Sequence, residues 1–332
     1  MIKEWAPIII PTLNRYDHFE RCISSLSENI GAEQTEIYIS VDYPPASKYK
    51  DGYNKICNFL NTSKSLKKFK KFYIFFQKEN LGAWGNTEFL KKMIADKGYK
   101  KYIYTEDDNE FSINFLQYIN LGLDLFEKDT NIISINGMKD TDYNFWGENY
   151  GVGKMYPAYG VGSWVYKEDD LEDDLERILL KNDAWNLKSI TKLFKKNKYI
   201  FALYVNGIIC TDRGVFWNGS QLKSIDSART IYMYITNKYC IIPSISKVRN
   251  WGNDGSGDNM PKSKKIENKY LDTNDKFEYN DINVRYNDLN DKIAEKYLKT
   301  VLGFKYLVKA IIQYSVFFIL GKNRKKFLKI KG

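Results

Sequence analysis

The chain of 332 residues is 43% hydrophobic and 28% charged, a balance typical of a folded globular protein with one large or two small domains. Its four cysteines, widely spaced and without a C-x-x-C pair, exclude an obvious zinc site and a disulfide framework, and the single histidine argues against a His-based metal site or triad. The net charge of +10 belongs to the tail, because residues 299–332 hold nine Lys or Arg and no Asp or Glu, whereas the other residues are almost neutral.

The first third of the chain alternates predicted strands with predicted helices. Short runs of apolar, aromatic and β-branched residues predict buried strands at 8–10, 36–42, 72–76 and 101–105. Apolar residues at helical spacing predict helices at 16–26, at 51–60, and from Asn86 to about Lys97. This alternation is typical of an α/β fold with a mostly parallel central sheet, right-handed crossovers and flanking helices.

The later elements follow less regularly. The same patterns predict helices at 115–126 and 224–232 and strands at 131–136 and 239–242. The acidic run 168–174 is interpreted as the solvated start of a helix rather than as a second metal site. Residues 250–257 predict a flexible glycine-rich loop, and the polar segment that follows predicts a loosely ordered linker.

Three carboxylates, Glu106, Asp107 and Asp108, directly follow the fourth predicted strand. Like charges this close repel each other, so they are expected either on a solvated loop or around a cation. Open α/β sheets bind ligands at the carboxyl ends of their strands, where one or two carboxylates can hold a divalent ion that also contacts phosphate. A plain polar turn is the alternative interpretation of this stretch.

Four motifs in order resemble those of a known family. Pro11-Thr-Leu-Asn-Arg15, Val41-Asp42 and Asn80-Leu-Gly82 each follow a predicted strand, and Thr105-Glu-Asp-Asp-Asn-Glu-Phe-Ser112 has the form of an acidic DXD site. Together they resemble GT-A-type glycosyltransferases of the family 2-like bacterial group. A more distant similarity is to N-acetylglucosaminyltransferase I, where an acidic pair precedes a comparable glycine loop.

The late part of the chain extends this resemblance over roughly residues 5–258. Segments 225–229 and 246–257 are similar to bacterial sugar transferases of polysaccharide assembly. The chain departs from these relatives at Gly160-Val-Gly-Ser-Trp164, where they often carry Trp-Gly-Trp, which concerns acceptor recognition more than donor binding. The resemblance implies a GT-A fold and a metal-dependent, inverting glycosyltransferase of the hexosyltransferase class, with a nucleotide-sugar donor that we expect to be UDP-linked.

The same resemblance assigns residues to the nucleotide-sugar site: Thr12, Asn14, Arg15, Asp42, Asn80, Gly82, Glu106 and Asp107. Asp42 would meet the base, since a carboxylate accepts a hydrogen bond from an imide N–H. Asp107 and Asp108 would coordinate Mg²⁺ or Mn²⁺ at the diphosphate. A turn before a helix is the alternative interpretation of Asn80 and Gly82.

Inversion requires one base on the acceptor hydroxyl, opposite the leaving nucleotide. By the resemblance, and without a histidine to serve, that base is Asp226 rather than Asp212. Asp226 near the start of a predicted helix is also compatible with an N-terminal cap.

The predicted domains are a catalytic domain at 1–258, a polar linker at 259–298 and a tail at 299–332. In the tail, residues 301–320 predict an apolar helix on which Lys305, Lys309 and Gln313 share one stripe, and six Lys or Arg follow it. This pattern favours an interfacial anchor on an anionic membrane, with a helix packed on protein as the alternative. No signal peptide is visible, so we expect a cytoplasmic protein, peripheral on the inner face of the cell membrane.

Two other classes of protein are alternatives to a transferase that acts on a glycan or lipid-linked acceptor in surface polysaccharide assembly. A sugar nucleotidyltransferase also binds nucleotide diphosphates, but its usual glycine-rich N-terminal loop with a basic residue is absent between Pro11 and Arg15. A nucleic-acid-binding protein would use the basic tail. Against nucleic acid as a partner, the body is nearly neutral and the cations lie beside an apolar helix.

Overall fold

The computed structural model describes residues 2–139, 148–168, 187–206, 217–218, 221–222, 225–255, 270–280 and 288–320. An eight-stranded sheet forms its centre, in the order β3 (Lys71–Phe76), β2 (Glu36–Val41), β1 (Ile8–Thr12), β4 (Lys101–Tyr104), β8 (Val161–Trp164), β6 (Ile132–Asn136), β11 (Tyr239–Pro243) and β7 (Tyr150–Gly153). Strands β3, β2, β1 and β4 pair in parallel, as do β6 and β11, whereas β8 and β7 pair antiparallel with their neighbours. The predicted α/β fold with a mostly parallel sheet is confirmed.

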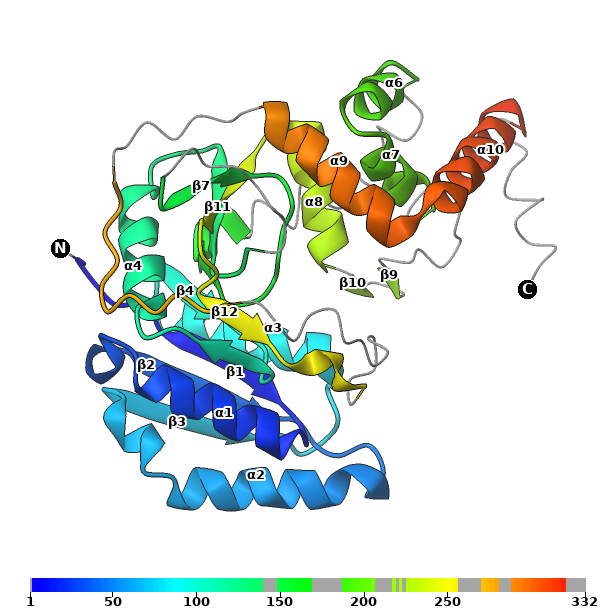
Figure 1. Cartoon of the computed structure of the whole chain (residues 1–332). Helices are drawn as coiled ribbons and strands as arrows, with labels where there is room; N and C mark the ends of the chain where they lie inside the picture. Colours follow the sequence, from blue (N-terminus) through cyan, green and yellow to red (C-terminus); the bar gives the residue numbers. More distant parts are fainter. Residues whose placement is uncertain are drawn as a thin grey trace.

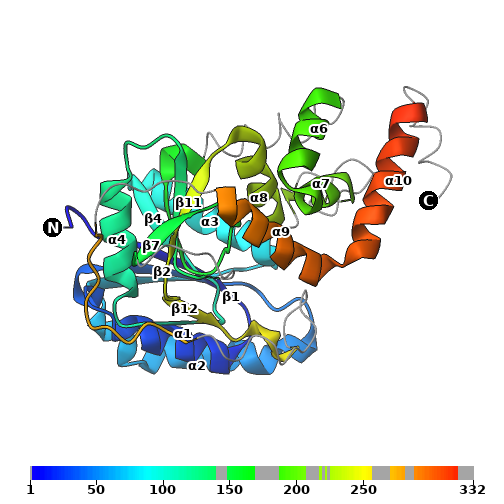
Figure 2. The same cartoon turned by 45° about the horizontal axis from the view of Figure 1, so that its top comes forward.

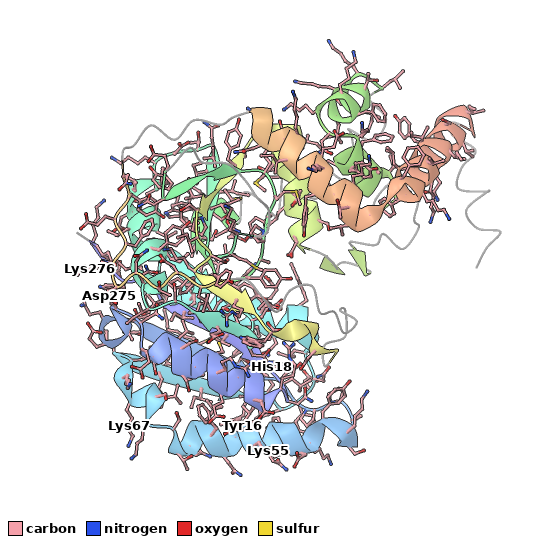
Figure 3. The ribbon with its side chains drawn as sticks, in the orientation of Figure 1. Tyr16, His18, Lys55, Lys67, Asp275 and Lys276 are labelled. Carbon is pink, nitrogen blue, oxygen red and sulfur yellow. The ribbon has the colours of Figure 1, made fainter. Side chains whose placement is uncertain are left out.

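The parallel half of the sheet is covered on both faces. Side chains alternate along each strand, so that Ile8 and Ile10 of β1 belong to one core and Ile9 to another. Helices α1 (Tyr16–Ser27), α2 (Lys50–Thr62) and α4 (Phe115–Leu125) pack on the first face, and α3 (Gly82–Asp96) packs on the second. Figure 1 shows α1 and α2 side by side along the sheet, and Figure 3 labels Tyr16 and Lys55 near their contact.

A group of helices extends from the other end of the sheet. Helix α8 (Ile225–Thr236) shares a core with β6 and β8, and α6 (Leu187–Lys196), α7 (Lys198–Tyr204), α9 (Asp288–Leu302) and α10 (Phe304–Leu320) complete that core. Figures 1 and 2 both show α6, α7, α9 and α10 standing away from β1–β3. Short strands complete the described elements: β5 (Asn109–Phe111) pairs antiparallel with β12 (Val248–Asn250), and β9 (Trp217–Asn218) with β10 (Gln221–Leu222). Within the part of the chain that the structure describes, four 3₁₀ turns lie at Ala32–Gln34, Ser47–Tyr49, Ser65–Lys68 and Gly252–Asp254.

Part of the predicted linker is packed against the body. Residues 270–280, which we call the strap, lie along α4, and Figure 3 labels their exposed Asp275 and Lys276. Asp272 forms a buried ion pair with Lys247 and accepts a hydrogen bond from Asn114 Nδ2 at 2.9 Å. Phe277 packs edge-on against Tyr118 with ring centroids 4.9 Å apart. The strap therefore differs from the expected loose linker, because one buried ion pair and an aromatic cluster hold it. The division into three domains stays a prediction.

We expect Asp272→Asn to lower the free energy of unfolding by about 3–5 kcal/mol, because it leaves Lys247 buried without its counter-charge. Burial raises the pKa of Asp272, but hydrogen bonds from Lys247, Asn114 and the Asn274 backbone outweigh burial and lower it overall. Since the folded pKa lies below 3.8, the stabilisation is present above that pH and is lost as pH falls through the lowered value. Urea denaturation at several pH values measures this. Asp275→Asn, at an exposed strap position, is the control, and equal stability of both variants would contradict the assigned role of the pair.

Candidate functional site

The predicted acidic residues lie at the carboxyl end of β4, next to the end of β1. Asp107 accepts a hydrogen bond from Thr12 Oγ1 at 2.7 Å, and Arg15 forms an ion pair with it through Nη2. The other guanidinium nitrogen of Arg15, Nη1, lies 2.6 Å from Asp108 Oδ2. The predicted site residues Thr12, Arg15, Asp107 and Asp108 are thus brought together, because β1 and β4 are parallel neighbours whose carboxyl ends meet.

The glycine-rich segment closes the other side of the acidic pair. Asn250 Nδ2 donates to Asp108 Oδ1 at 2.7 Å, and the backbone N–H of Trp251 donates to the Asp108 carbonyl at 2.8 Å. A Cβ added to Gly252 would lie 2.3 Å from Asp108 Oδ2, so only glycine fits there. The predicted flexible loop is therefore partly β12 and a 3₁₀ turn. Asn250 and Gly252 belong to the segment 246–257 that carries the resemblance, which implies no role for either residue.

The electrostatics of the site follow from burial of several carboxylates around one guanidinium. Burial and the charge of Asp108 raise the pKa of Asp107, against the opposing effects of Arg15 and Thr12. Burial and the charges of Asp108 and Asp226 raise the pKa of Glu106 to about 8, although Arg15 opposes the shift. Burial and the acidic neighbours thus favour the protonated form of Glu106. The Asp107 and Asp108 charges outweigh burial and raise the pKa of Arg15, which stays charged.

Asp42 lies at the end of β2 and is held by the loop before α3. Its Oδ1 accepts hydrogen bonds from the backbone N–H of Leu81 at 2.8 Å and of Tyr43 at 2.9 Å, and its Oδ2 accepts one from Asn80 Nδ2 at 3.0 Å. Burial raises the pKa of Asp42 in spite of these backbone hydrogen bonds. Gly82 has φ +70°, which favours glycine at this turn. The contacts agree with the turn interpretation of Asn80 and Gly82, and the nucleotide role stays a prediction.

The predicted base, Asp226, contributes to the electrostatics of Glu106. Asp226 is in the first turn of α8 and is half-buried. Burial raises the pKa of Tyr104 well above its usual value, and the charges of Glu106 and Asp226 raise it further. Because Asp226 acts electrostatically on both Glu106 and Tyr104, it lies close to the acidic residues although it is far away in sequence. Asp212 falls outside the described residues.

Asn14 is placed at the same rim through its backbone. A Cβ added to Gly52 of α2 would lie 1.9 Å from the Asn14 carbonyl oxygen, so α2 approaches this loop closely. A ligand contact of the Asn14 side chain stays a prediction.

The acidic pair has the donor chemistry for a hard divalent cation. Mg²⁺ is commonly held by one or two carboxylates together with substrate phosphates. All four carboxylate oxygens of Asp107 and Asp108 already accept hydrogen bonds from Thr12, Arg15 or Asn250. Among the described residues there is no group of three or more His, Cys, Asp and Glu side chains that is suited to a metal ion. The donor set fits a cation that shares its coordination with phosphate, provided that Arg15 gives way.

The sequence also did not predict a buried ion pair that involves α8. Arg229 of α8 forms an ion pair with Glu168, and both side chains are buried. Glu168 begins the acidic run that was interpreted as solvated, and this interpretation is wrong for Glu168. The rest of that run, residues 169–174, lies outside the described residues. The position of Arg229 one turn after Asp226 was the available signal.

No protein-family model and no curated protein matches the chain. Among solved structures, the mannosyltransferase PcManGT from Pyrobaculum calidifontis, in complex with GDP-Man and Mn²⁺, is 11% identical over 51% of this chain and 46% of its own, with a TM-score of 0.36. Residues 1–349 of S. aureus TarS are 12% identical over 71% of this chain and 56% of theirs, with a TM-score of 0.37. The same TarS segment in complex with UDP-GlcNAc is 13% identical over 49% of this chain and 47% of its own, with a TM-score of 0.34. The chain spans about half the length of these proteins, and the likeness is one of fold.

Proposed function

We propose that the protein is a metal-dependent, inverting glycosyltransferase that uses a nucleotide-sugar donor. The observation that carries this proposal is the convergence of Thr12, Arg15 and Asp42 with the acidic pair at the carboxyl ends of parallel strands, and the charge of Asp226 raises the pKa of Glu106 in the same site. Ligands of open α/β sheets bind at this edge. A separate carboxylate facing the site supplies the base that acceptor activation needs.

Different residues of the site act on the donor and on the acceptor. Asp107 and Asp108 would hold Mg²⁺ or Mn²⁺, which as a Lewis acid supports departure of the nucleotide. Thr12 positions the acidic pair, Arg15 would leave the pair to the cation and line the nucleotide pocket, and Asp42 would accept a hydrogen bond from the nucleobase. Glu106 would orient the donor sugar or nucleotide, and Asp226 would take the proton from the acceptor hydroxyl.

The first test measures donor binding and turnover. UDP, UDP-GlcNAc and GDP-Man, the ligands of the compared structures, form the panel for calorimetry and for hydrolysis with Mn²⁺ or Mg²⁺. We expect Asp108→Asn to lower hydrolysis at least 100-fold while the protein stays folded, because one carboxylate of the cation site is lost. Glu33→Gln, at an exposed carboxylate, is the control. Full activity in excess chelator, or no nucleotide binding by the unchanged protein, would contradict the proposal.

We further propose that the acceptor is a glycan or a lipid-linked glycan of surface polysaccharide assembly, and that α10 brings the protein to an anionic membrane at the cytoplasmic face. One face of α10 packs through Leu307, Ala310 and Tyr314 into the core shared with α7. Its other face leaves Ile312 58% and Ile319 79% exposed, beside exposed Lys305 and Lys309. No described helix is long and apolar enough to cross a bilayer. The packed face of α10 therefore fits the packed-helix alternative, and its exposed face fits the interfacial anchor.

We expect the double variant Ile312→Asp and Ile319→Asp to lose sedimentation with anionic liposomes while it keeps donor hydrolysis. Buried apolar surface contributes about 25 cal/mol per Å², and each Lys or Arg near an anionic surface adds about 1 kcal/mol, an attraction that salt weakens. Tyr270→Asp, at an exposed position of the strap, is the control. Equal binding of the double variant and the unchanged protein would contradict the membrane role of this face.

A further inference from the structure

A cavity of about 170 Å³ lies between α3, β4, β8 and α8, beside the acidic residues. Its volume far exceeds the roughly 30 Å³ that one water takes in the liquid. The wall is aromatic on the α3 and β4 side, where Trp84, Tyr102 and Tyr104 line it. Glu106 lines the same cavity, so the cavity opens next to the proposed donor site.

The opposite wall is a buried polar network centred on Arg229. Arg229 Nη1 donates to the Tyr156 hydroxyl and Nη2 to Glu168 Oε2, while Ser163 Oγ donates to Glu168 Oε1 at 2.7 Å. Lys91 of α3 completes the network, with Nζ 3.8 Å from Glu168 Oε2. These contacts fix the guanidinium plane, because Arg229 is held at two nitrogens and lies 4.8 Å over the Tyr156 ring.

One donor of this network has no partner among the described residues. Arg229 is 4% exposed, and its Nε–H makes no hydrogen bond there although the side chain lines the cavity. A buried N–H without an acceptor is costly, and an acceptor oxygen of a bound ligand would offset that cost. Flat aromatic walls with few fixed polar groups are the usual lining of a small-molecule pocket.

We propose that this cavity binds the ring of the transferred sugar, and that Arg229 selects a donor sugar whose substituent carries an acceptor oxygen. The inference rests on the proposed function and specifies the substrate class of that site. An acetamido carbonyl and a carboxylate share this chemistry, and both accept a hydrogen bond from a guanidinium more strongly than the hydroxyls of a plain hexose. Trp84 and Tyr104 supply the apolar contact with the ring, and Arg229 acts as a specificity-determining residue.

Two variants test the two walls separately. Ala83→Leu narrows the cavity from an exposed position of α3 and leaves the buried network untouched. Ala95→Leu makes the same change at an exposed position of the same helix outside the cavity lining. Arg229→Lys keeps the charge opposite Glu168 and removes the Nε donor. Calorimetry with UDP, UDP-glucose, UDP-GlcNAc and UDP-glucuronate then separates nucleotide binding from sugar binding.

We expect Ala83→Leu to weaken every nucleotide-sugar at least tenfold relative to UDP, and Ala95→Leu to change none of them, since a misplaced methylene in a fitted pocket costs about 10- to 200-fold. Arg229→Lys should weaken the binding of UDP-GlcNAc or UDP-glucuronate at least tenfold more than the binding of UDP-glucose. Whichever of the two nucleotide-sugars loses more affinity identifies the substituent that Arg229 recognises. Unchanged affinities for the nucleotide-sugars in both variants would overturn the inference while the proposed function stands. The same holds if the affinity for UDP falls as much as the affinities for the nucleotide-sugars. An unchanged protein that binds no nucleotide would overturn both.

Discussion

Replacing Arg15 by methionine is expected to destabilise the fold by about 3–5 kcal/mol and to create affinity for Mn²⁺ in the absence of nucleotide. Arg15 is the cation that faces Asp107 and Asp108, whose side chains are 5% and 6% exposed. Without the guanidinium, adjacent buried carboxylates repel each other and lack a counter-charge. A divalent cation can then replace the lost charge, because hard carboxylate oxygens become available to it.

The measurement is urea denaturation of Arg15→Met with and without Mn²⁺, together with metal titration by calorimetry. Mn²⁺ should restore part of the lost stability through linkage between binding and folding. The deficit should also shrink as pH falls, because the uncompensated carboxylates take up protons. Arg21→Met is the matched control, since Arg21 lies on α1, the helix that Arg15 caps, with its guanidinium carbon 4.4 Å from the centroid of the Trp251 ring. A stable Arg15→Met protein without Mn²⁺ affinity would show that Arg15 is not the resident counter-ion.

Asp226→Asn is expected to lower kcat of sugar transfer by about 10²- to 10⁴-fold, the usual contribution of a general base. Donor affinity should change less than threefold, because the base acts on the acceptor hydroxyl. The amide also removes one of the charges that raise the pKa of Glu106, so that this pKa should fall. A change confined to packing of the helix start would leave the titration of Glu106 unaltered.

Single-turnover kinetics with saturating donor separate this effect from binding, and donor hydrolysis measures the side reaction in which water replaces the acceptor. Ser227→Ala, at the next position of α8, reports any general disturbance of the helix start. Loss of donor affinity together with transfer would identify Asp226 as a binding or structural residue instead. Full transfer activity of Asp226→Asn would place the base elsewhere.

The strands and helices of the first half were predictable because each has a strong local pattern. Ile8 to Ile10 and Phe72 to Phe76 are short apolar runs, and the structure extends them only slightly to β1 and β3. The boundary of α3 was less accurate, since the helix begins at Gly82 rather than after Asn86. Local signals thus identified elements better than they identified ends.

Partners between distant segments were not predictable in the same way. Arg15 was assigned to a nucleotide pocket, but its contacts with Asp107 and Asp108 depend on β1 lying beside β4. Glu168 carries the same local signal as any acidic helix start, and only the position of Arg229 makes it a buried partner. Likewise, Asp272 lies in a polar stretch, and its burial depends on Lys247. Charge alone did not identify which acidic residues are buried.

The hydrogen bond from Asn250 to Asp108 joins residues 142 positions apart, and it has a consequence for synthesis of the chain. A ribosome delivers residues N-terminal first, at about 5–20 per second, so β1, β4 and the Arg15 contacts can form many seconds before β12 exists. During that interval Asp108 lacks the side-chain amide and the backbone donor that later cover it. During the same interval β5 lacks its partner strand β12, and unpaired strand edges promote aggregation. We therefore expect chains that stop before Val248 to be retained by chaperones, and chains that extend past Gly252 to be released.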